Sequence, residues 1–254
     1  MLVSIVNRTG SITDADVQRA VRAINRQLAE DFEPHWQFGA RLRLDAAGER
    51  PARHDGAALL KRLPDRRGDA VVYLVDHATV ADAEGYHDRN GGDVPCGFVF
   101  LETCKECGDP WTMALSHEVL ELVGDPMNNL TVQGPHPHDH RCMVFHTFEV
   151  CDPVQSESYE IDGVIVSNFV LPGWYTKGDA AGVRNDFLGR RTPGEVLPSF
   201  AMAPGGYLCF WDPRREGDHW HSLMTEGDEV AAQRLAAKRR AGLGRGVRRQ
   251  HAER

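Results

Sequence analysis

The chain has 254 residues, of which 41% are hydrophobic and 26% are charged, a composition typical of a globular protein with one large domain or two small ones. Its longest apolar runs fall well short of the roughly 20 residues that a membrane helix needs, so we expect no membrane partner. The N-terminus shows no basic leader followed by a long apolar stretch, so we expect a cytoplasmic protein.

The net charge of −8 is divided unevenly along the chain. Residues 234–254 carry eight Lys and Arg side chains against one Glu, so this tail has a charge of +7 and the remaining chain has −15. A body this acidic repels phosphate backbones, which argues against a nucleic-acid enzyme. The tail is expected either to fold back on the acidic body or to contact an anionic partner.

Six cysteines are too few for a disulfide scaffold in a chain of this length. Cys104 and Cys107 form one C-x-x-C pair, whereas a thiolate zinc site normally has a second pair at similar spacing. We therefore expect reduced thiols and no thiolate zinc site.

The first two elements are predicted from an apolar run and from capping residues. Residues 2–6 are mostly apolar and are followed by a turn, which predicts a strand. Thr13 and Asp16 have the spacing of a capping box, and the apolar positions that follow recur at helical spacing. Pro34 is expected to end this helix.

Three further strands are predicted from their apolar patterns. Apolar and polar residues alternate over 38–44, whereas 70–75 is apolar throughout, and 97–101 forms another apolar run. We expect residues 45–69 to form a loop with a short helix around Leu59, Leu60 and Leu63. Residues 85–95 are polar and are expected to form turns.

A second helix is predicted over 111–123. Asp109 is expected to be its N-cap, Pro110 its first residue, and Gly124 its end through a left-handed turn. The order of strand, helix, three strands and helix predicts an α/β sheet packed by two helices.

Beyond residue 127, short apolar runs at 161–166, 168–171 and 207–210 are separated by Gly, Pro and Asp, which predicts an irregular, β-leaning lobe. We expect this lobe to close a cleft over the second helix. The chain is then divided into an N-terminal subdomain, the lobe, and a polar linker with the basic tail, at 1–127, 128–212 and 213–254.

The second helix carries a narrow polar stripe among apolar neighbours. His117 and Glu121 stand at i and i+4, so both project from one face, and Glu118 lies beside them. Buried carboxylates are rarely left unpaired, and a cation would compensate them. In the zinc motif H-E-x-x-H two histidines bind the metal and the intervening Glu takes a proton from water; here Glu121 stands at the second histidine.

The third ligand is left open between three acids. Asp125 either folds back onto the metal or accepts backbone N–H bonds in its own turn, and Glu149 and Asp152 stand three residues apart. Three histidines lie in a Pro-broken loop and are not expected in a fixed ligand shell: His136, His138 and His140.

These features resemble the N-terminal subdomain of the zincin metalloproteases, in which the active-site helix packs under a mixed sheet whose edge strand binds peptide. The string SHEVLELVGDP, with the later FEVCDP, is also similar to bacterial and phage proteins with H-E-x-x-E-x-x-x-D-P and E-x-x-D, and plant phosphate-induced proteins have a similar pair.

The zincin resemblance implies that His117 is the first zinc ligand and that Glu118 is the general base. Met127 stands where the extended metzincin motif has its third histidine. Glu149 and Asp152 resemble the later pair of gluzincins, in which the Glu binds zinc and the Asp bonds a ligating histidine.

We therefore expect a zinc-dependent peptide hydrolase with a peptide or protein substrate. Zinc would be held by His117, Glu121 and either Glu149 or Asp152, and Glu118 would activate water. One alternative is a catalytically inactive zincin-like binding or assembly protein with a structural cation or acid cluster. Another is a scaffolding module tethered by its tail.

Overall fold

The structure is a computed structural model that describes residues 1–47, 63, 65–78, 83–178, 183–189, 196–216 and 219–224. The apolar patch expected at Leu59 and Leu60 and the basic tail at 234–254 lie outside these residues.

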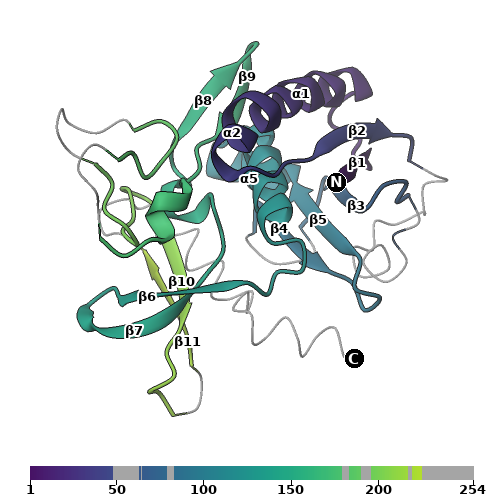
Figure 1. The fold of residues 1–254 in the computed structure, drawn as a ribbon. Coiled ribbons are helices and arrows are strands. Elements are labelled where there is room, and N and C mark those ends of the chain that lie inside the picture. The colour runs from purple at the N-terminus through teal and green to yellow at the C-terminus, as the bar shows by residue number, and fades with distance from the viewer. Residues whose placement is uncertain are drawn as a thin grey trace.

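A mixed five-stranded sheet occupies the first half of the chain, with strand order β2-β1-β3-β5-β4 (Figure 1). Strands β1, β2, β3 and β5 run parallel, and β4 pairs antiparallel with β5 at one edge. This confirms the predicted mixed sheet of an α/β fold. The strands are β1 (Leu2–Asn7), β2 (Arg41–Asp45), β3 (Ala70–Val75), β4 (Gly85–Arg89) and β5 (Pro95–Phe100).

Strand β4 corrects the expectation that residues 85–95 form only turns. Its sequence, Gly-Tyr-His-Asp-Arg, has none of the apolar alternation that marks a half-buried strand. The strand packs against helix α5 (Trp111–Gly124), and its fully buried position is taken by His87. Because the inward-facing position holds a polar residue, the apolar pattern of the sequence did not predict this strand.

The first helix is longer than predicted. Helix α1 (Asp14–Arg26) begins with the predicted capping box of Thr13 and Asp16. It continues through a π-helical turn η1 (Gln27–Phe32) into α2 (Glu33–Trp36). Pro34 does not end the helix, because it lies in the first turn of α2, where its missing N–H is tolerated.

Two corrections concern the second helix and its surroundings. A short helix α4 (Leu101–Cys107), not predicted, follows β5 directly. Helix α5 has Pro110 rather than Asp109 as its N-cap, and Gly124 is its last helical residue rather than a left-handed exit. The glycine is favoured there by packing, since a Cβ atom would lie 3.2 Å from the Phe148 ring.

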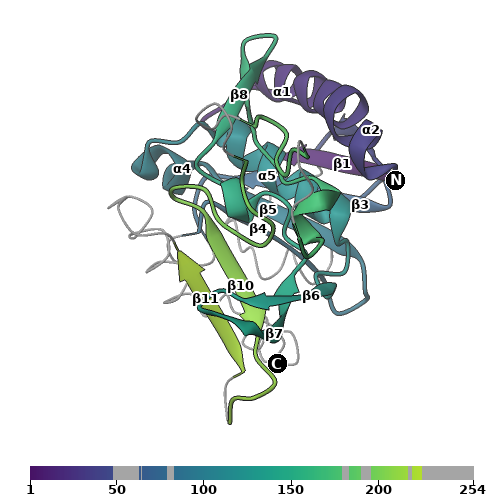
Figure 2. The same cartoon turned by 60° about the vertical axis from the view of Figure 1, so that its left-hand side comes forward.

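The second half is more regular than predicted. An antiparallel sheet has the order β11-β10-β7-β6 (Figure 2), and a separate hairpin joins β8 and β9. The expected His/Pro loop is therefore a hairpin, and part of the expected linker is a strand. The strands are β6 (Thr131–His136), β7 (Asp139–Thr147), β8 (Ser158–Ile161), β9 (Val164–Ser167), β10 (Tyr207–Trp211) and β11 (Trp220–Met224).

Of the strands predicted here, β10 agrees most closely with its apolar run. Residues 168–171 make only an isolated bridge at Val170. Two 3₁₀ turns complete the lobe, η2 (Asp152–Val154) and η3 (Pro172–Tyr175).

One continuous apolar core joins the two halves. It includes Ile5 of β1, Val21 of α1, Leu115 of α5, and Phe169 and Leu208 from the second half, all of them buried. The second half therefore packs on the same face of the first sheet as α1 and α5, with β9 against α5.

None of the helices in the described ranges is long and apolar enough to cross a membrane. All six cysteines are free thiols.

Candidate metal centre

Helix α5 is held in place by a buried polar network just before its polar stripe. The Ser116 hydroxyl donates to Gln27 Oε1 at 2.7 Å, and Gln27 Nε2 donates to the Ser167 carbonyl at 2.8 Å. The Ser167 amide in turn donates to Ser116 Oγ at 3.1 Å. Because these buried groups satisfy one another, they fix the position of α5 against η1 and β9.

Glu121 is anchored by one carboxylate oxygen and presents the other to His117. Its Oε1 accepts hydrogen bonds from the amides of Cys151 and Asp152, at 3.1 and 3.3 Å. Its Oε2 lies 3.2 Å from His117 Nε2. The same Nε2 lies 3.4 Å from Asp152 Oδ1. The structure thus brings together His117, Glu121 and one of the three distal acids.

A second histidine, which the sequence analysis missed, faces the same carboxylate. His87 Nδ1 lies 3.6 Å from Glu118 Oε2 and 3.7 Å from Glu121 Oε2, and its Nε2 lies 3.7 Å from Glu149 Oε2. Gly85 permits this approach, because a Cβ atom there would lie 2.8 Å from Glu118 Cγ. No motif spacing connects His87 with the residues of α5. The one sequence feature that could have identified His87 is its position as a histidine within a strand.

Glu149 and Asp152 therefore have different neighbours. Asp152 lies beside His117 and Glu149 lies beside His87. Asp125 takes the second of its two expected roles, since its Oδ2 accepts the Leu130 amide at 2.7 Å in the turn after α5.

The histidines of the β6–β7 hairpin have other contacts. His136 Nδ1 accepts hydrogen bonds from the amides of His138 and Asp139. His140 is exposed on β7. None of the three belongs to the metal-capable groups found among the described residues.

The cluster has only a narrow contact with solvent. The side chains of His87 and Glu121 are 3% and 4% exposed, whereas those of His117 and Glu149 keep 12% and 13%. Solvent therefore reaches the cluster mainly at His117 and Glu149.

The acids control the protonation of both imidazoles. Burial lowers the pKa of His87, but the charge of Glu149 and the contacts with Glu118 and Glu121 outweigh it and raise the pKa to about 9. Burial likewise opposes the protonation of His117, but Glu121 and Asp152 leave its pKa well above the usual value. In the absence of a metal, the acids therefore favour the protonated form of both imidazoles.

This protonation predicts how the stability of the metal-free protein depends on pH. Because the folded-state pKa of His87 exceeds its unfolded value near 6.5, the stabilisation is fully present below pH 6.5 and is lost as the pH rises to about 9. Urea unfolding of chelator-treated protein should therefore show a falling free energy of unfolding over this interval. His87→Gln should make the profile shallower, with the remaining slope due to His117, and an unchanged slope in this variant would contradict the assignment.

Two pairs of donors, both of which include His117, have the spacing of ligands on one zinc ion. Two ligands held about 2.0–2.1 Å from one tetrahedral zinc ion lie about 3.3–3.4 Å apart. His117 Nε2 lies 3.2 Å from Glu121 Oε2 and 3.4 Å from Asp152 Oδ1. Two groups of three metal-capable residues share Glu121, and neither includes Asp152: His117, Glu121 and Cys151, and His87, Glu118 and Glu121.

A tyrosine hydroxyl is buried near this cluster. Tyr175 Oη has no hydrogen-bond partner among the described residues. Burial raises the pKa of this phenol well above its usual value, and the charges of Glu149, Glu121 and Asp152 add to the effect. Its ring stacks on Phe148 with centroids 4.8 Å apart, which fixes its orientation.

Comparison with known proteins found no family model, curated protein or solved structure that matches the chain. The functional conclusion therefore rests on the contacts described above.

Proposed function

We propose that this protein is a zinc-dependent peptide hydrolase whose metal ligands are His117, Glu121 and Asp152. The observation that carries the proposal is the position of His117 Nε2, within 3.4 Å of a carboxylate oxygen of both acids. A zinc ion bound by these residues would polarise the scissile carbonyl and lower the pKa of water. Glu121 then stands in place of the second histidine of H-E-x-x-H.

Glu118 is the residue best placed to accept the proton of the attacking water. It stands on the same helix as both ligands but contacts His87 rather than His117. A carboxylate that lies close to the metal ligands but is not itself a ligand can take a proton from the attacking water without binding the metal. His87, 3.6 Å away, positions this carboxylate.

Tyr175 supplies a second polar group for the reaction. Its hydroxyl lacks a hydrogen-bond partner in the described structure, and its ring is held by Phe148. A buried O–H without a partner carries a desolvation cost, which a hydrogen bond to the oxygen of a bound substrate would remove. Such a donor stabilises the negative charge that develops on the carbonyl oxygen.

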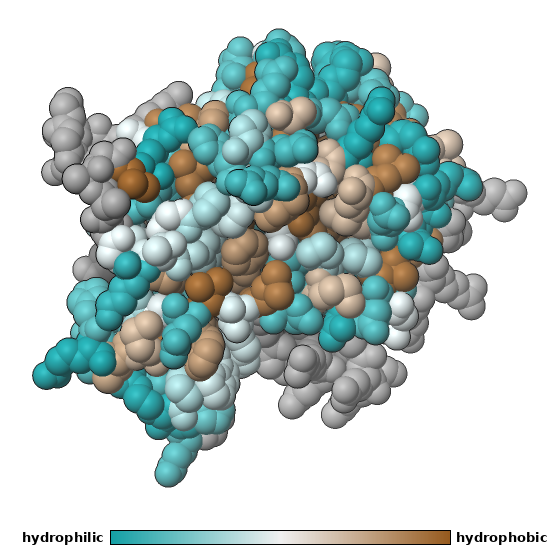
Figure 3. Space-filling view, viewed as in Figure 1, coloured by the Kyte–Doolittle hydropathy of each residue, from teal (hydrophilic) through white to brown (hydrophobic). Residues whose placement is uncertain are grey.

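A peptide substrate is supported by the surroundings of the cluster. Strand β4 is one of the two edge strands of its sheet, the position at which extended peptides add to a sheet, as the zincin resemblance implies. Aromatic rings of Trp36, Phe38, Phe148 and Tyr175 adjoin one another, with Phe38 38% exposed. Apolar atoms also gather in the middle of the face shown in Figure 3. We expect preference for an apolar residue beside the cleaved bond.

The direct test is cleavage of a peptide mixture. The purified protein, loaded with zinc and incubated with a diverse synthetic peptide library, should give products detectable by mass spectrometry. Chelator treatment should stop the cleavage and added zinc should restore it. Cleavage that survives complete zinc removal, or no cleavage of any peptide between pH 5 and 9, would refute the proposal.

The burial of the cluster favours a second candidate function, a structural cation site in a binding or assembly protein. The side chains of His87 and Asp152 are 3% and 9% exposed, which is little access for a substrate. In that case zinc would bind without peptide cleavage, and Glu118 would matter only for stability.

We also propose that the protein acts in the cytoplasm. All six cysteines are free thiols, and four of them are buried, which suits a reducing compartment.

A further inference from the structure

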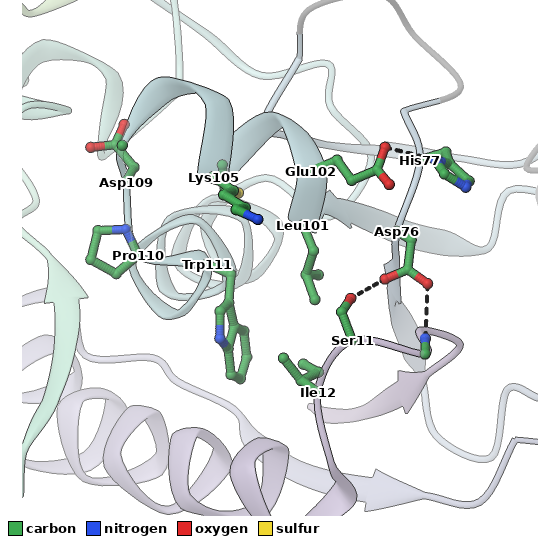
Figure 4. Close-up of a pocket in the computed structure, with 13 residues that line it drawn as sticks. Ser11, Ile12, Asp76, His77, Leu101, Glu102, Lys105, Asp109, Pro110 and Trp111 are labelled. Carbon is green, nitrogen blue, oxygen red and sulfur yellow. Dashed lines mark hydrogen bonds and ion pairs between the residues drawn. The ribbon is translucent and has the colours of Figure 1, made fainter.

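A separate pocket of about 790 Å³ opens at the carboxyl ends of the parallel strands (Figure 4). This volume falls in the range that small-molecule sites occupy. Its walls come from the segments that follow β1 and β3, from α4 and from the start of α5: Ser11, Ile12, Asp76, Leu101, Lys105 and Trp111.

The strand order places this pocket where ligands bind in open parallel sheets. The chain leaves β1 through α1 toward β2 on one side, whereas beyond β3 it continues to β4 and β5 on the other side. The two connections diverge, and a crevice opens between the carboxyl ends of β1 and β3. Crevices at such a point of reversed strand order are the usual ligand sites of these sheets.

The pocket has an apolar middle, and its charged lining consists of Lys105 and the acids Asp76, Glu102 and Asp109. Figure 4 shows Leu101 and Ile12 between Lys105 and Trp111 on one side and Asp76 on the other. The Asp76 carboxylate is held by the Gly10 amide at 2.8 Å and by the Ser11 hydroxyl.

Lys105 is the cation of this pocket. Its side chain is exposed, and no carboxylate partner for it occurs in the described part of the chain. The nearby acid Glu102 is already paired with His77, at 2.7 Å. A ligand carboxylate is therefore the anion that Lys105 lacks.

We propose that this pocket binds a small zwitterion with an apolar side chain, of the class of a free amino acid or a dipeptide. The ligand's carboxylate binds Lys105, its ammonium binds Asp76, and its side chain packs against Trp111. Both charges of the ligand are then matched, and its apolar part is removed from water.

This site is separate from the metal centre. Trp111 precedes His117 by six residues on α5, which is about 9 Å along the helix axis. The proposal therefore does not depend on hydrolysis, and its test needs no catalytic activity.

Isothermal titration calorimetry with L-phenylalanine tests the proposal on the full chain. The matched single-charge probes are 3-phenylpropionate, which lacks the ammonium, and 2-phenylethylamine, which lacks the carboxylate. Lys105→Met removes the cation at an exposed position, so folding should be preserved, and Lys177→Met is the matched control because Lys177 is also exposed.

L-phenylalanine should bind the wild type at least about tenfold more tightly than either single-charge probe, as expected for the loss of one charge-assisted contact. Lys105→Met should weaken L-phenylalanine about tenfold and leave 2-phenylethylamine unchanged. The absence of L-phenylalanine binding to the wild type, or equal binding by the Lys105 and Lys177 variants, would overturn the proposal.

Discussion

Replacing Glu118 by Gln should lower the rate of peptide cleavage by about 10²–10⁴-fold, the usual contribution of a positioned general base. The amide keeps the shape of the side chain and removes only its capacity to accept a proton. Because Glu118 is not one of the three proposed ligands, zinc content should stay at the wild-type level. Steady-state kinetics with a cleaved library peptide and zinc analysis of the same sample measure both quantities.

The matched control for this variant is Glu160→Gln. Glu160 is an exposed carboxylate on β8, so its replacement should leave the rate unchanged. If Glu118→Gln retains full activity, Glu118 is not the base. If Glu118→Gln loses zinc together with activity, Glu118 is a ligand instead.

Replacing His117 by Ala should remove the metal and destabilise the fold. The Glu121 and Asp152 carboxylates would stay buried without the imidazole or the ion that compensates them. Breaking a buried charge pair costs about 3–5 kcal/mol, which lowers the Tm of a protein of this size by about 10 °C. Differential scanning calorimetry of the wild type and of the variant, both after incubation with zinc, measures this shift.

His140→Ala is the control, because His140 is exposed on β7 and belongs to neither metal-capable group. It should melt like the wild type. A His117→Ala protein that retains wild-type zinc content and Tm would show that His117 neither binds the ion nor compensates the acids.

Patterns that depend on local spacing predicted the centre of the fold. Strand β3 is apolar throughout, and β1 and β5 are mostly apolar, because both faces of the sheet are covered, by Leu115 of α5 on one side and by Leu63 on the other. The i, i+4 spacing of His117 and Glu121 was sufficient to place both on one face of α5.

Contacts between distant segments could not be predicted in the same way. His87 reaches Glu118 and Glu121 only because β4 pairs with β5 and then packs on α5, and Gly85 leaves room for the approach. The preference of Asp152 over Glu149 for His117 depends on the Glu121 carboxylate, which binds the amides of Cys151 and Asp152. Neither the contacts of His87 nor the position of Asp152 beside His117 could be predicted from the spacing of these residues in the sequence.

Helix ends were mispredicted where packing outweighed local preference. Pro34 is tolerated because the π-helical turn before it starts a new helical register. Gly124 is favoured by its close packing against Phe148 rather than by a left-handed turn.

The measurement that tests the central claim most directly is the zinc content of the purified wild-type protein. The protein is saturated with zinc, freed of excess metal by gel filtration, and analysed by inductively coupled plasma mass spectrometry beside His117→Ala. We predict about one zinc ion per wild-type chain, the number that a single His117–Glu121–Asp152 set holds, and nearly none in the variant. A wild-type protein that retains no zinc, or a variant that retains as much as the wild type, would contradict the proposed metal centre.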